Sequence, residues 1–167
     1  MSEKKYNVLF LCTGNSARSI MAEAVLGTMG KGRFNVFSAG SMPNGQVNPF
    51  AIEKVQALGY PLEKLPSKSW DEYAEPGAPQ MDFIITVCDN AAGEVCPVWP
   101  GQPVSAHWGF VDPATAQGGD EEKRKVFDKV FRQIMTRAHI FASLPLATLD
   151  KAAIQREMQA IGARAPE

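Results

Sequence analysis

The sequence predicts an α/β fold, in which four parallel β-strands form one sheet with helices on both faces. Three observations lead to this class. Short apolar runs alternate with longer segments whose apolar residues recur at helical spacing. Glycines and prolines separate these segments. Polar residues suited to chemistry follow three of the strands, at the carboxyl ends where such sheets bind ligands.

The bulk properties are those of a globular protein of one domain. The chain has 167 residues, enough to bury a sizeable core, and we expect a single domain over 1–167. A net charge of −1 gives no support to binding of nucleic acid or of a membrane surface. The apolar run from Val8 to Leu11 is too short for a signal-peptide core or a membrane span, so we expect a cytoplasmic protein.

The first elements follow in a strand–helix alternation. A continuous apolar run over Tyr6 to Leu11 is typical of a strand covered on both faces. From Ser19, apolar residues recur at helical spacing until Gly30 to Gly32 end the helix. The next elements are a strand over Phe34 to Ala39 and a helix that begins at Pro49 and that Gly59 closes.

The middle of the chain contains one predicted strand within irregular structure. Pro61 to Pro79 is mostly loop, with a short helical turn expected at Trp70 to Tyr73. Asp82 to Val87 is a strongly apolar strand that leads directly to Cys88. The segment from Asp89 to Pro103 contains two glycines and three prolines, and we expect it to be irregular.

A fourth strand and two helices complete the chain. The strand is expected over Val104 to Trp108. Acidic residues from Asp120 complement the dipole of the longest helix in its first turn. A last helix is expected from Asp150, an N-cap, to Ile161, within a C-terminal extension (about 145–167) to a core of about 6–144. The predicted core stripe of the longest helix consists of Val126, Phe127, Val130, Phe131, Ile134, Ala138 and Phe141.

A small polar loop connects the first strand to the first helix. Cys12 begins the loop and Arg18 ends it, with five residues between them. Gly14 and Asn15 readily adopt unusual φ angles. If the loop curls so that its backbone N–H groups point inward, it forms an anion-binding cradle at the start of the helix. The expected oxyanion-binding residues are Thr13, Gly14, Asn15, Ser16, Ala17 and Arg18.

This setting predicts a nucleophilic thiolate that faces a tetrahedral oxyanion. Inward N–H dipoles and the Arg18 guanidinium would lower the pKa of Cys12 from about 8.5 to between about 3.5 and 7.5. The planar guanidinium offers paired donors for two oxygens of the anion. Ser19 would either satisfy a backbone group at the helix end or donate to the Cys12 sulfur. The alternative is that Cys12 is a small buried apolar residue.

The remaining candidates are a carboxylate and two thiols. Asp112 could protonate a departing oxygen, or it could simply form an Asp-Pro turn. Cys88 and Cys96 could be reactive or inert. Because the chain has three cysteines, they cannot all pair, and in a reducing compartment this favours reactive thiols over structural disulfides. Without Cys-x2-Cys or His-x3-His spacing, we expect no zinc site with His107, and His139 is expected to be exposed or structural.

The motifs resemble the low-molecular-weight tyrosine phosphatase family, and more narrowly its thioredoxin-coupled arsenate reductases. The loop from Cys12 to Ser19, followed by Met21-Ala22-Glu23-Ala24, looks like the signature of that fold. The likeness covers about residues 6–141. Further matching motifs, in order, are Phe37-Ser38-Ala39-Gly40, Asn48-Pro49, Val87-Cys88-Asp89, Cys96-Pro97, and His107-Trp108-Gly109-Phe110 with Asp112-Pro113.

The resemblance implies arsenate reduction by a relay of three thiols, as in arsenical resistance and detoxification. Cys12 would attack arsenate, held by Arg18 and the loop amides, while Asp112 protonates the leaving group. Cys88 would then attack Cys12 and release arsenite, and Cys96 would take over the disulfide as Cys88–Cys96. Thioredoxin, or a glutaredoxin-type reductant, would regenerate the thiols. Phosphate and sulfate would compete as oxyanions, and a monomer is expected.

The chain also departs from the family pattern. Many relatives have a second cysteine before the loop arginine, where this chain has Ala17, which is outside the implied relay. Asn15, Glu23 and Ser38 match part of a potassium site that some relatives have; otherwise no metal is expected. The alternative function is a phosphatase that hydrolyses aryl phosphates through a Cys12 phosphoenzyme. The pair of Cys88 and Cys96 favours reduction, since a phosphatase does not need it.

Overall fold

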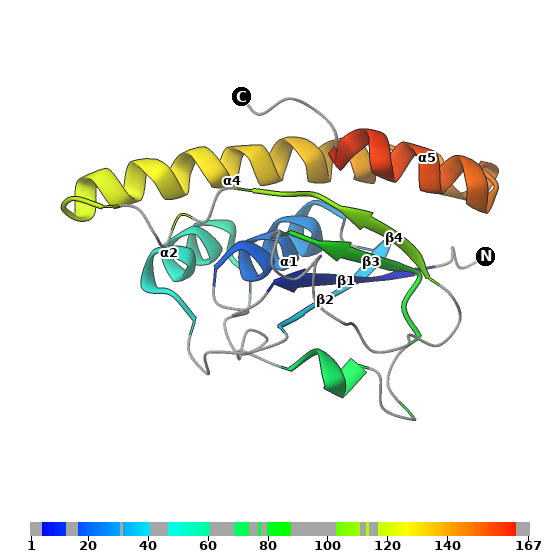
Figure 1. Cartoon of the computed structure of the whole chain (residues 1–167), viewed down its shortest axis with the longest axis horizontal. Helices are drawn as coiled ribbons and strands as arrows, with labels where there is room; N and C mark the ends of the chain where they lie inside the picture. Colours follow the sequence, from blue (N-terminus) through cyan, green and yellow to red (C-terminus); the bar gives the residue numbers. More distant parts are fainter. Residues whose placement is uncertain are drawn as a thin grey trace.

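The computed structural model describes residues 5–12, 17–30, 32–40, 47–60, 69–73, 77, 80–87, 103–110, 113 and 117–162. Four parallel strands form one sheet in the order β2-β1-β3-β4 (Figure 1). The predicted α/β class with a four-stranded parallel sheet is therefore confirmed. The strands are β1 (Tyr6–Cys12), β2 (Phe34–Gly40), β3 (Phe83–Thr86) and β4 (Val104–His107).

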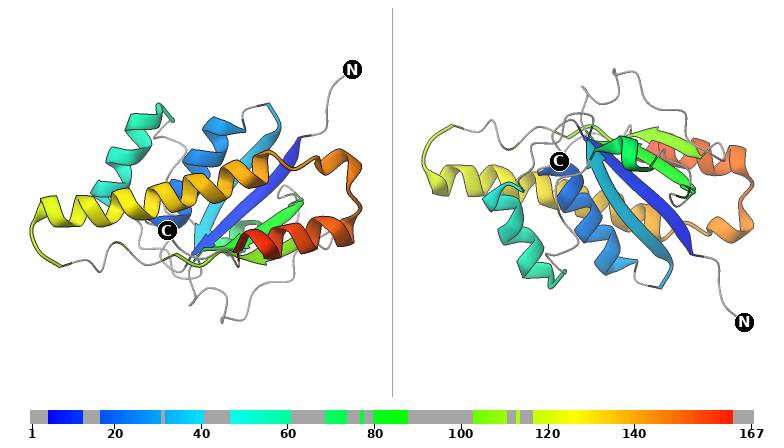
Figure 2. Two further views of the ribbon diagram at one scale, coloured as in Figure 1. Left: turned by 90° about the horizontal axis from the view of Figure 1, so that it is seen from above. Right: turned by 90° about the horizontal axis from the view of Figure 1, so that it is seen from below.

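The described α-helices lie on one side of the sheet. Figure 2 shows α4 and α5 in front of the strands when seen from above, and the strands in front when seen from below. The short 3-10 helix η2 lies on the opposite side (Figure 1). The helices are α1 (Arg18–Met29), α2 (Pro49–Leu58), η2 (Trp70–Tyr73), α4 (Asp120–Ala142), η4 (Leu146–Thr148) and α5 (Lys151–Gly162).

Local sequence signals account for the helix ends. The side chain of Asn48 accepts a hydrogen bond from the N–H of Phe50, and Pro49 begins α2. Gly59 ends that helix with a φ of 76°, a conformation that glycine adopts without a steric penalty. Asp150 caps α5 as expected, because its Oδ1 accepts from the N–H of Ala153 over 2.7 Å.

The main core lies between the sheet and the helices α1, α4 and α5. Aromatic rings join the layers: Phe141 of α4 contacts both Phe83 and Trp108 edge-on, at centroid distances of 4.9 and 5.9 Å. Most of the predicted stripe of α4 is buried, whereas Val126 and Phe131 are half-buried. The buried members of the stripe are Phe127, Val130, Ile134, Ala138 and Phe141.

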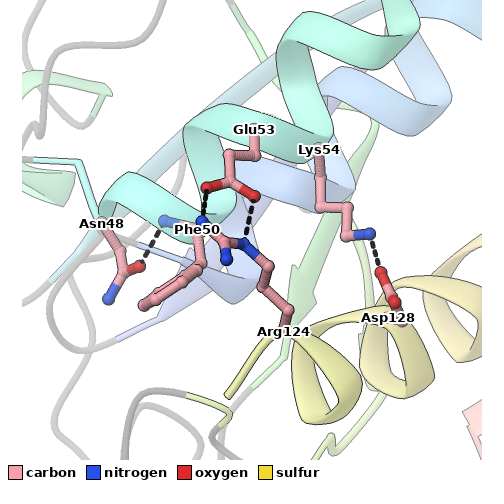
Figure 3. Close-up of polar contacts among 6 residues, drawn as sticks. All are labelled: Asn48, Phe50, Glu53, Lys54, Arg124 and Asp128. Carbon is pink, nitrogen blue, oxygen red and sulfur yellow. Dashed lines mark hydrogen bonds and ion pairs between the residues drawn. The ribbon is translucent and has the colours of Figure 1, made fainter. Parts of the chain in front are cut away.

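Ion pairs fasten α2 to α4. The Arg124 guanidinium binds both carboxylate oxygens of Glu53 at 3.0 Å, and Lys54 pairs with Asp128 (Figure 3). The hydrogen bond from Arg124 lowers the pKa of the Glu53 carboxyl below its ordinary value. Because Glu53 and Arg124 are exposed, this pair adds little to the stability of the fold.

Helix α5 covers the outer edge of β4. The side-chain amide of Gln155 donates to the carbonyl oxygen of Ser105 and accepts from its N–H, as a neighbouring strand would. The indole N–H of Trp108 donates to the carbonyl oxygen of Met158 over 3.1 Å. Within the described part of the chain, no helix is long and apolar enough to cross a membrane.

Candidate functional site

The carboxyl ends of the four parallel strands lie at one edge of the sheet. Leu11 of β1 lies opposite Thr86 of β3, and Thr86 lies opposite His107 of β4. On the other side, Cys12 lies opposite Gly40 of β2. Cys12 is the last residue of β1, Cys88 follows β3, and Asp112 follows β4 in the sequence. Parallel strands in register therefore place Cys12 at the same end of the sheet as the strand ends that precede the other two residues in the sequence.

Cys12, the last residue of β1, is buried in the main core. Its exposed fraction is 4%, and it belongs to the main core cluster together with Ala17. Ala17 is the N-cap of α1, and its methyl side chain cannot accept a hydrogen bond from the first N–H groups of the helix. These N–H groups and the positive end of the helix dipole are the features that bind an oxyanion and favour a thiolate.

Arg18 extends from the first position of α1 toward the end of β4. Its Nη1 donates a hydrogen bond of 3.0 Å to the carbonyl oxygen of Phe110. A guanidinium has five N–H donors, so one bond to a carbonyl is compatible with a paired contact to an oxyanion. The predicted oxyanion arginine is thus oriented by a backbone carbonyl of the segment that follows β4.

Backbone hydrogen bonds join the three strand ends beyond the sheet itself. The N–H of Val87 donates to the carbonyl oxygen of Leu11 over 2.9 Å. The N–H of Phe110 donates to the carbonyl oxygen of Val87 over 3.3 Å. Leu11 directly precedes Cys12, and Val87 directly precedes Cys88. The chain positions that lead into the two thiols are consequently held side by side.

A buried polar cluster lies beside this end of β2. The Glu23 carboxyl accepts hydrogen bonds of 2.7 Å from the hydroxyls of Ser38 and Tyr60, one on each oxygen. Glu23 is 2% exposed and Ser38 is fully buried. Ser19, the other predicted residue on α1, is also fully buried. Of the predicted potassium ligands, Glu23 and Ser38 are thus brought together, and Tyr60 joins them.

Several predicted residues lie outside the described part of the chain, and their roles stay predictions. Among the residues that the structure describes, no group of three His, Cys, Asp or Glu side chains could hold a metal ion. His139 is exposed, as expected, and His107 Nδ1 lies 2.7 Å from the hydroxyl of Thr86. The undescribed residues are Thr13, Gly14, Asn15, Ser16, Cys88, Cys96 and Asp112.

The sequence did not indicate the contacts that Tyr60 makes with Glu23, that Phe110 makes with Arg18, and that Arg137 makes with the carbonyl oxygen of Gly109. Phe110 is buried, and its backbone carbonyl and N–H bind Arg18 and Val87, respectively. One sequence signal could have indicated that Arg137 is buried: it lies three residues after Ile134, on the helix face that carries the apolar stripe. No local pattern distinguishes Tyr60.

The fold and the cysteine–arginine loop define the class of this protein. The chain belongs to the low molecular weight phosphotyrosine protein phosphatase family, whose model matches residues 7–160. The matched range includes most of α5, which thus lies within the family's extent.

Within that family, the chain is similar to proteins named arsenate reductase. The arsenate reductase of Halalkalibacterium halodurans is 40% identical over 135 residues, which cover 81% of this chain and 94% of the relative. A solved arsenate reductase in its intermediate state has a TM-score of 0.64 at 26% identity, covering 83% of this chain and 97% of that one. A thioredoxin-dependent arsenate reductase of Corynebacterium glutamicum shares the fold, with a TM-score of 0.53 at 23% identity; the match covers 83% of this chain and 64% of that one.

Proposed function

We propose that this protein is an arsenate reductase that converts arsenate to arsenite with Cys12 as the nucleophile. The observation that carries the proposal is the hydrogen bond between Val87 and Leu11, which holds the residues before Cys88 and Cys12 side by side. A thiol exchange needs its two sulfurs within reach of each other. The similarity to arsenate reductases at 40% identity supports the same reaction.

The first step forms a bond between sulfur and arsenic. The Cys12 thiolate attacks the arsenic of arsenate, whose oxygens are bound by Arg18 and the amides of residues 13–17. One oxygen leaves as water, with a proton supplied by Asp112 in its protonated form. The position of Cys12 in one cluster with Ala17, the N-cap of α1, supports this role, because the N–H groups at a helix start favour both a thiolate and a bound oxyanion.

The following steps transfer two electrons to arsenic. Cys88 attacks the Cys12 sulfur, a Cys12–Cys88 disulfide forms, and the electron pair of the sulfur–arsenic bond reduces arsenic(V) to arsenic(III), released as arsenite. Cys96 then attacks Cys88, so that the disulfide becomes Cys88–Cys96 and Cys12 is again a thiolate. A dithiol reductant, thioredoxin or a glutaredoxin-type protein, reduces this disulfide. We place the enzyme in the cytoplasm, where such reductants operate, and expect a monomer.

The alternative function is hydrolysis of aryl phosphates, the activity in the family's name. The same cradle accepts phosphate and arsenate, since the two anions have the same charge and nearly the same shape. Phosphate and sulfate are accordingly expected to compete with arsenate. The presence of Cys88 and Cys96 favours reduction, because hydrolysis through Cys12 does not use them.

Potassium is a further proposal for the cluster around Glu23. The site presents a buried carboxyl and two hydroxyls, which are the hard oxygen donors that an alkali cation prefers. A cation there would offset the cost of burying a charged carboxylate. Its role would be structural. Ser38 lies on β2, two residues before Gly40, the register partner of Cys12, so a cation bound there would support the strand beside the cysteine.

Replacing Cys88 with serine tests the proposed function. Cys88→Ser is expected to abolish multiple-turnover arsenate reduction with thioredoxin and to spare weak hydrolysis of aryl phosphates. Cys12→Ser is the matched comparison and should lose both activities, because both begin at the Cys12 thiolate. Arsenate reduction through many turnovers by Cys88→Ser would refute the relay, and retention of either activity by Cys12→Ser would remove Cys12 from the chemistry.

A further inference from the structure

Arg137 is the only basic side chain among the described residues that is buried in the core. It lies on α4, is 7% exposed, and is surrounded along the helix by the core residues Ile134, Ala138 and Phe141. A charged group in such a position is costly unless hydrogen bonds and other favourable contacts compensate for its lost hydration. The contacts of this guanidinium therefore indicate what its burial achieves.

The guanidinium of Arg137 holds the segment that follows β4. Its Nη1 donates a hydrogen bond of 3.0 Å to the carbonyl oxygen of Gly109. Its Cζ lies 4.6 Å from the ring centroid of Phe110, within the range of a cation–π contact. One side chain thus fixes two consecutive residues, the first through the backbone and the second through the ring.

Phe110 in turn connects this segment to the oxyanion arginine. Its carbonyl oxygen accepts the 3.0 Å hydrogen bond from Nη1 of Arg18, and its N–H donates to the carbonyl oxygen of Val87. The two guanidiniums, one from α4 and one from α1, bind consecutive carbonyl groups, those of Gly109 and Phe110. A rotation of the Phe110 peptide would move the acceptor away from Arg18.

We propose that Arg137 is a positioning residue for oxyanion binding, which acts on Arg18 through the backbone of Phe110. By fixing Gly109 and the ring of Phe110, Arg137 aims the Phe110 carbonyl at Arg18 and keeps that guanidinium in one orientation. The proposal rests on the proposed role of Arg18 in binding the oxyanion. A donor that is held in place before binding loses less conformational freedom when the anion arrives, so the anion binds more tightly.

The test measures oxyanion binding without arsenate turnover. In a Cys88→Ser/Cys96→Ser background, Cys12 is the remaining thiol, and we expect inorganic phosphate to protect it from alkylation by iodoacetamide. Arg137→Met is expected to raise the phosphate concentration for half-protection by about tenfold. Arg137→Lys should recover part of the loss, because an ammonium can donate to Gly109 but does not present a planar group to the ring. Arg132→Met, an exposed position on the same helix, is the matched control and should leave protection unchanged.

A double-mutant cycle separates positioning from a general loss of stability. In an Arg18→Lys background, Arg137→Met should raise the half-protecting phosphate concentration by much less than tenfold, because the planar group that it orients is gone. An equal effect in both backgrounds, or unchanged protection by a folded Arg137→Met, overturns the proposal. If Arg137→Met does not unfold cooperatively, Arg137→Lys and Phe110→Leu are measured in its place. An unchanged half-protecting phosphate concentration in both of these variants also overturns the proposal.

The outcome is independent of the proposed reductase activity. If wild-type protein fails to reduce arsenate while phosphate still protects Cys12 and the cycle shows coupling, the reductase proposal fails and the role of Arg137 stands. If arsenate is reduced and the cycle shows no coupling, the role of Arg137 fails alone.

Discussion

The backbone N–H of Val87 donates a hydrogen bond of 2.9 Å to the carbonyl oxygen of Leu11. These residues directly precede Cys88 and Cys12, so this bond links the approaches to two of the three proposed relay thiols. A second backbone hydrogen bond extends this connection, because the N–H of Phe110 donates to the carbonyl oxygen of Val87. The sheet therefore supplies a fixed frame for the proposed reaction, whose residues follow its strands in the sequence.

The pKa of Cys12 is expected to lie well below about 8.5, because the start of α1 favours the thiolate. The measurement is the rate of alkylation by iodoacetamide against pH, in a Cys88→Ser/Cys96→Ser variant whose single thiol is Cys12. A midpoint at least one unit below about 8.5 is the expected result. An ordinary midpoint would instead favour an oxyanion-binding protein without catalysis.

Tyr60→Phe is expected to lower the free energy of unfolding by about 1–3 kcal/mol, because it removes one donor to the buried Glu23 carboxyl. Chemical denaturation measures the change. Ser143→Ala is the control: its hydroxyl donates to the carbonyl oxygen of His139 at an exposed helix end, and its loss should cost no more than about 0.5 kcal/mol. Equal effects of the two changes would contradict the assigned importance of the buried cluster.

If the Glu23 cluster binds potassium, KCl should raise the melting temperature more than an equal concentration of tetramethylammonium chloride. The reason is that a cation that binds only the folded state stabilises it. Glu23→Gln, which keeps the shape of the side chain without its charge, should abolish the difference between the two salts. If the melting temperatures in the two salts still differ in Glu23→Gln, potassium acts at a site other than the Glu23 cluster.

Gly162→Ala is expected to destabilise the protein by about 1–3 kcal/mol, although alanine favours helix by up to about 1 kcal/mol over glycine. An added Cβ would lie 2.2 Å from the carbonyl oxygen of His107 and 3.0 Å from Cδ1 of Trp108, so α5 would have to move away from β4. Denaturation of Gln159→Ala, an exposed position on α5, provides the comparison. Unchanged stability of Gly162→Ala would show that α5 is not held closely against β4.

The pair of Glu53 and Arg124 should contribute to stability only above acidic pH. Its hydrogen bond lowers the pKa of the Glu53 carboxyl in the folded state. The stabilisation is therefore fully present above the unfolded pKa of about 4.3 and is lost as the pH falls through the lower folded value. Denaturation of Glu53→Gln against wild type should show a small difference at neutral pH, which disappears in acid and shrinks in high salt.

Much of the fold could be predicted because local signals agreed with tertiary packing. Asn48-Pro49 and Gly59 delimit α2, and Asp150 caps α5, as their side chains and backbone freedom dictate. The placement of the described α-helices on one side of the sheet could not be predicted. Which face a helix covers depends on its connections and on long-range packing, neither of which leaves a periodic signal in the sequence.

The candidate site was predicted less completely than the fold. Cys12 and Arg18 could be proposed from the sequence, because a cysteine and an arginine separated by five residues after a strand are typical of an anion-binding loop. The support of Arg18 was not, because its partner is a backbone carbonyl, that of Phe110, to which any residue type could contribute. Arg137 acts at a distance of 28 residues from Gly109 along the chain, and only the folded structure joins them.

Mapping of disulfides after a single turnover tests the central claim most directly. Reduced protein is mixed with one equivalent of arsenate in the absence of any reductant, quenched with acid and alkylating agent, and analysed by peptide mass spectrometry. A Cys88–Cys96 disulfide with Cys12 alkylated, together with one equivalent of arsenite, is the predicted result. Three alkylated cysteines and no arsenite would contradict the account.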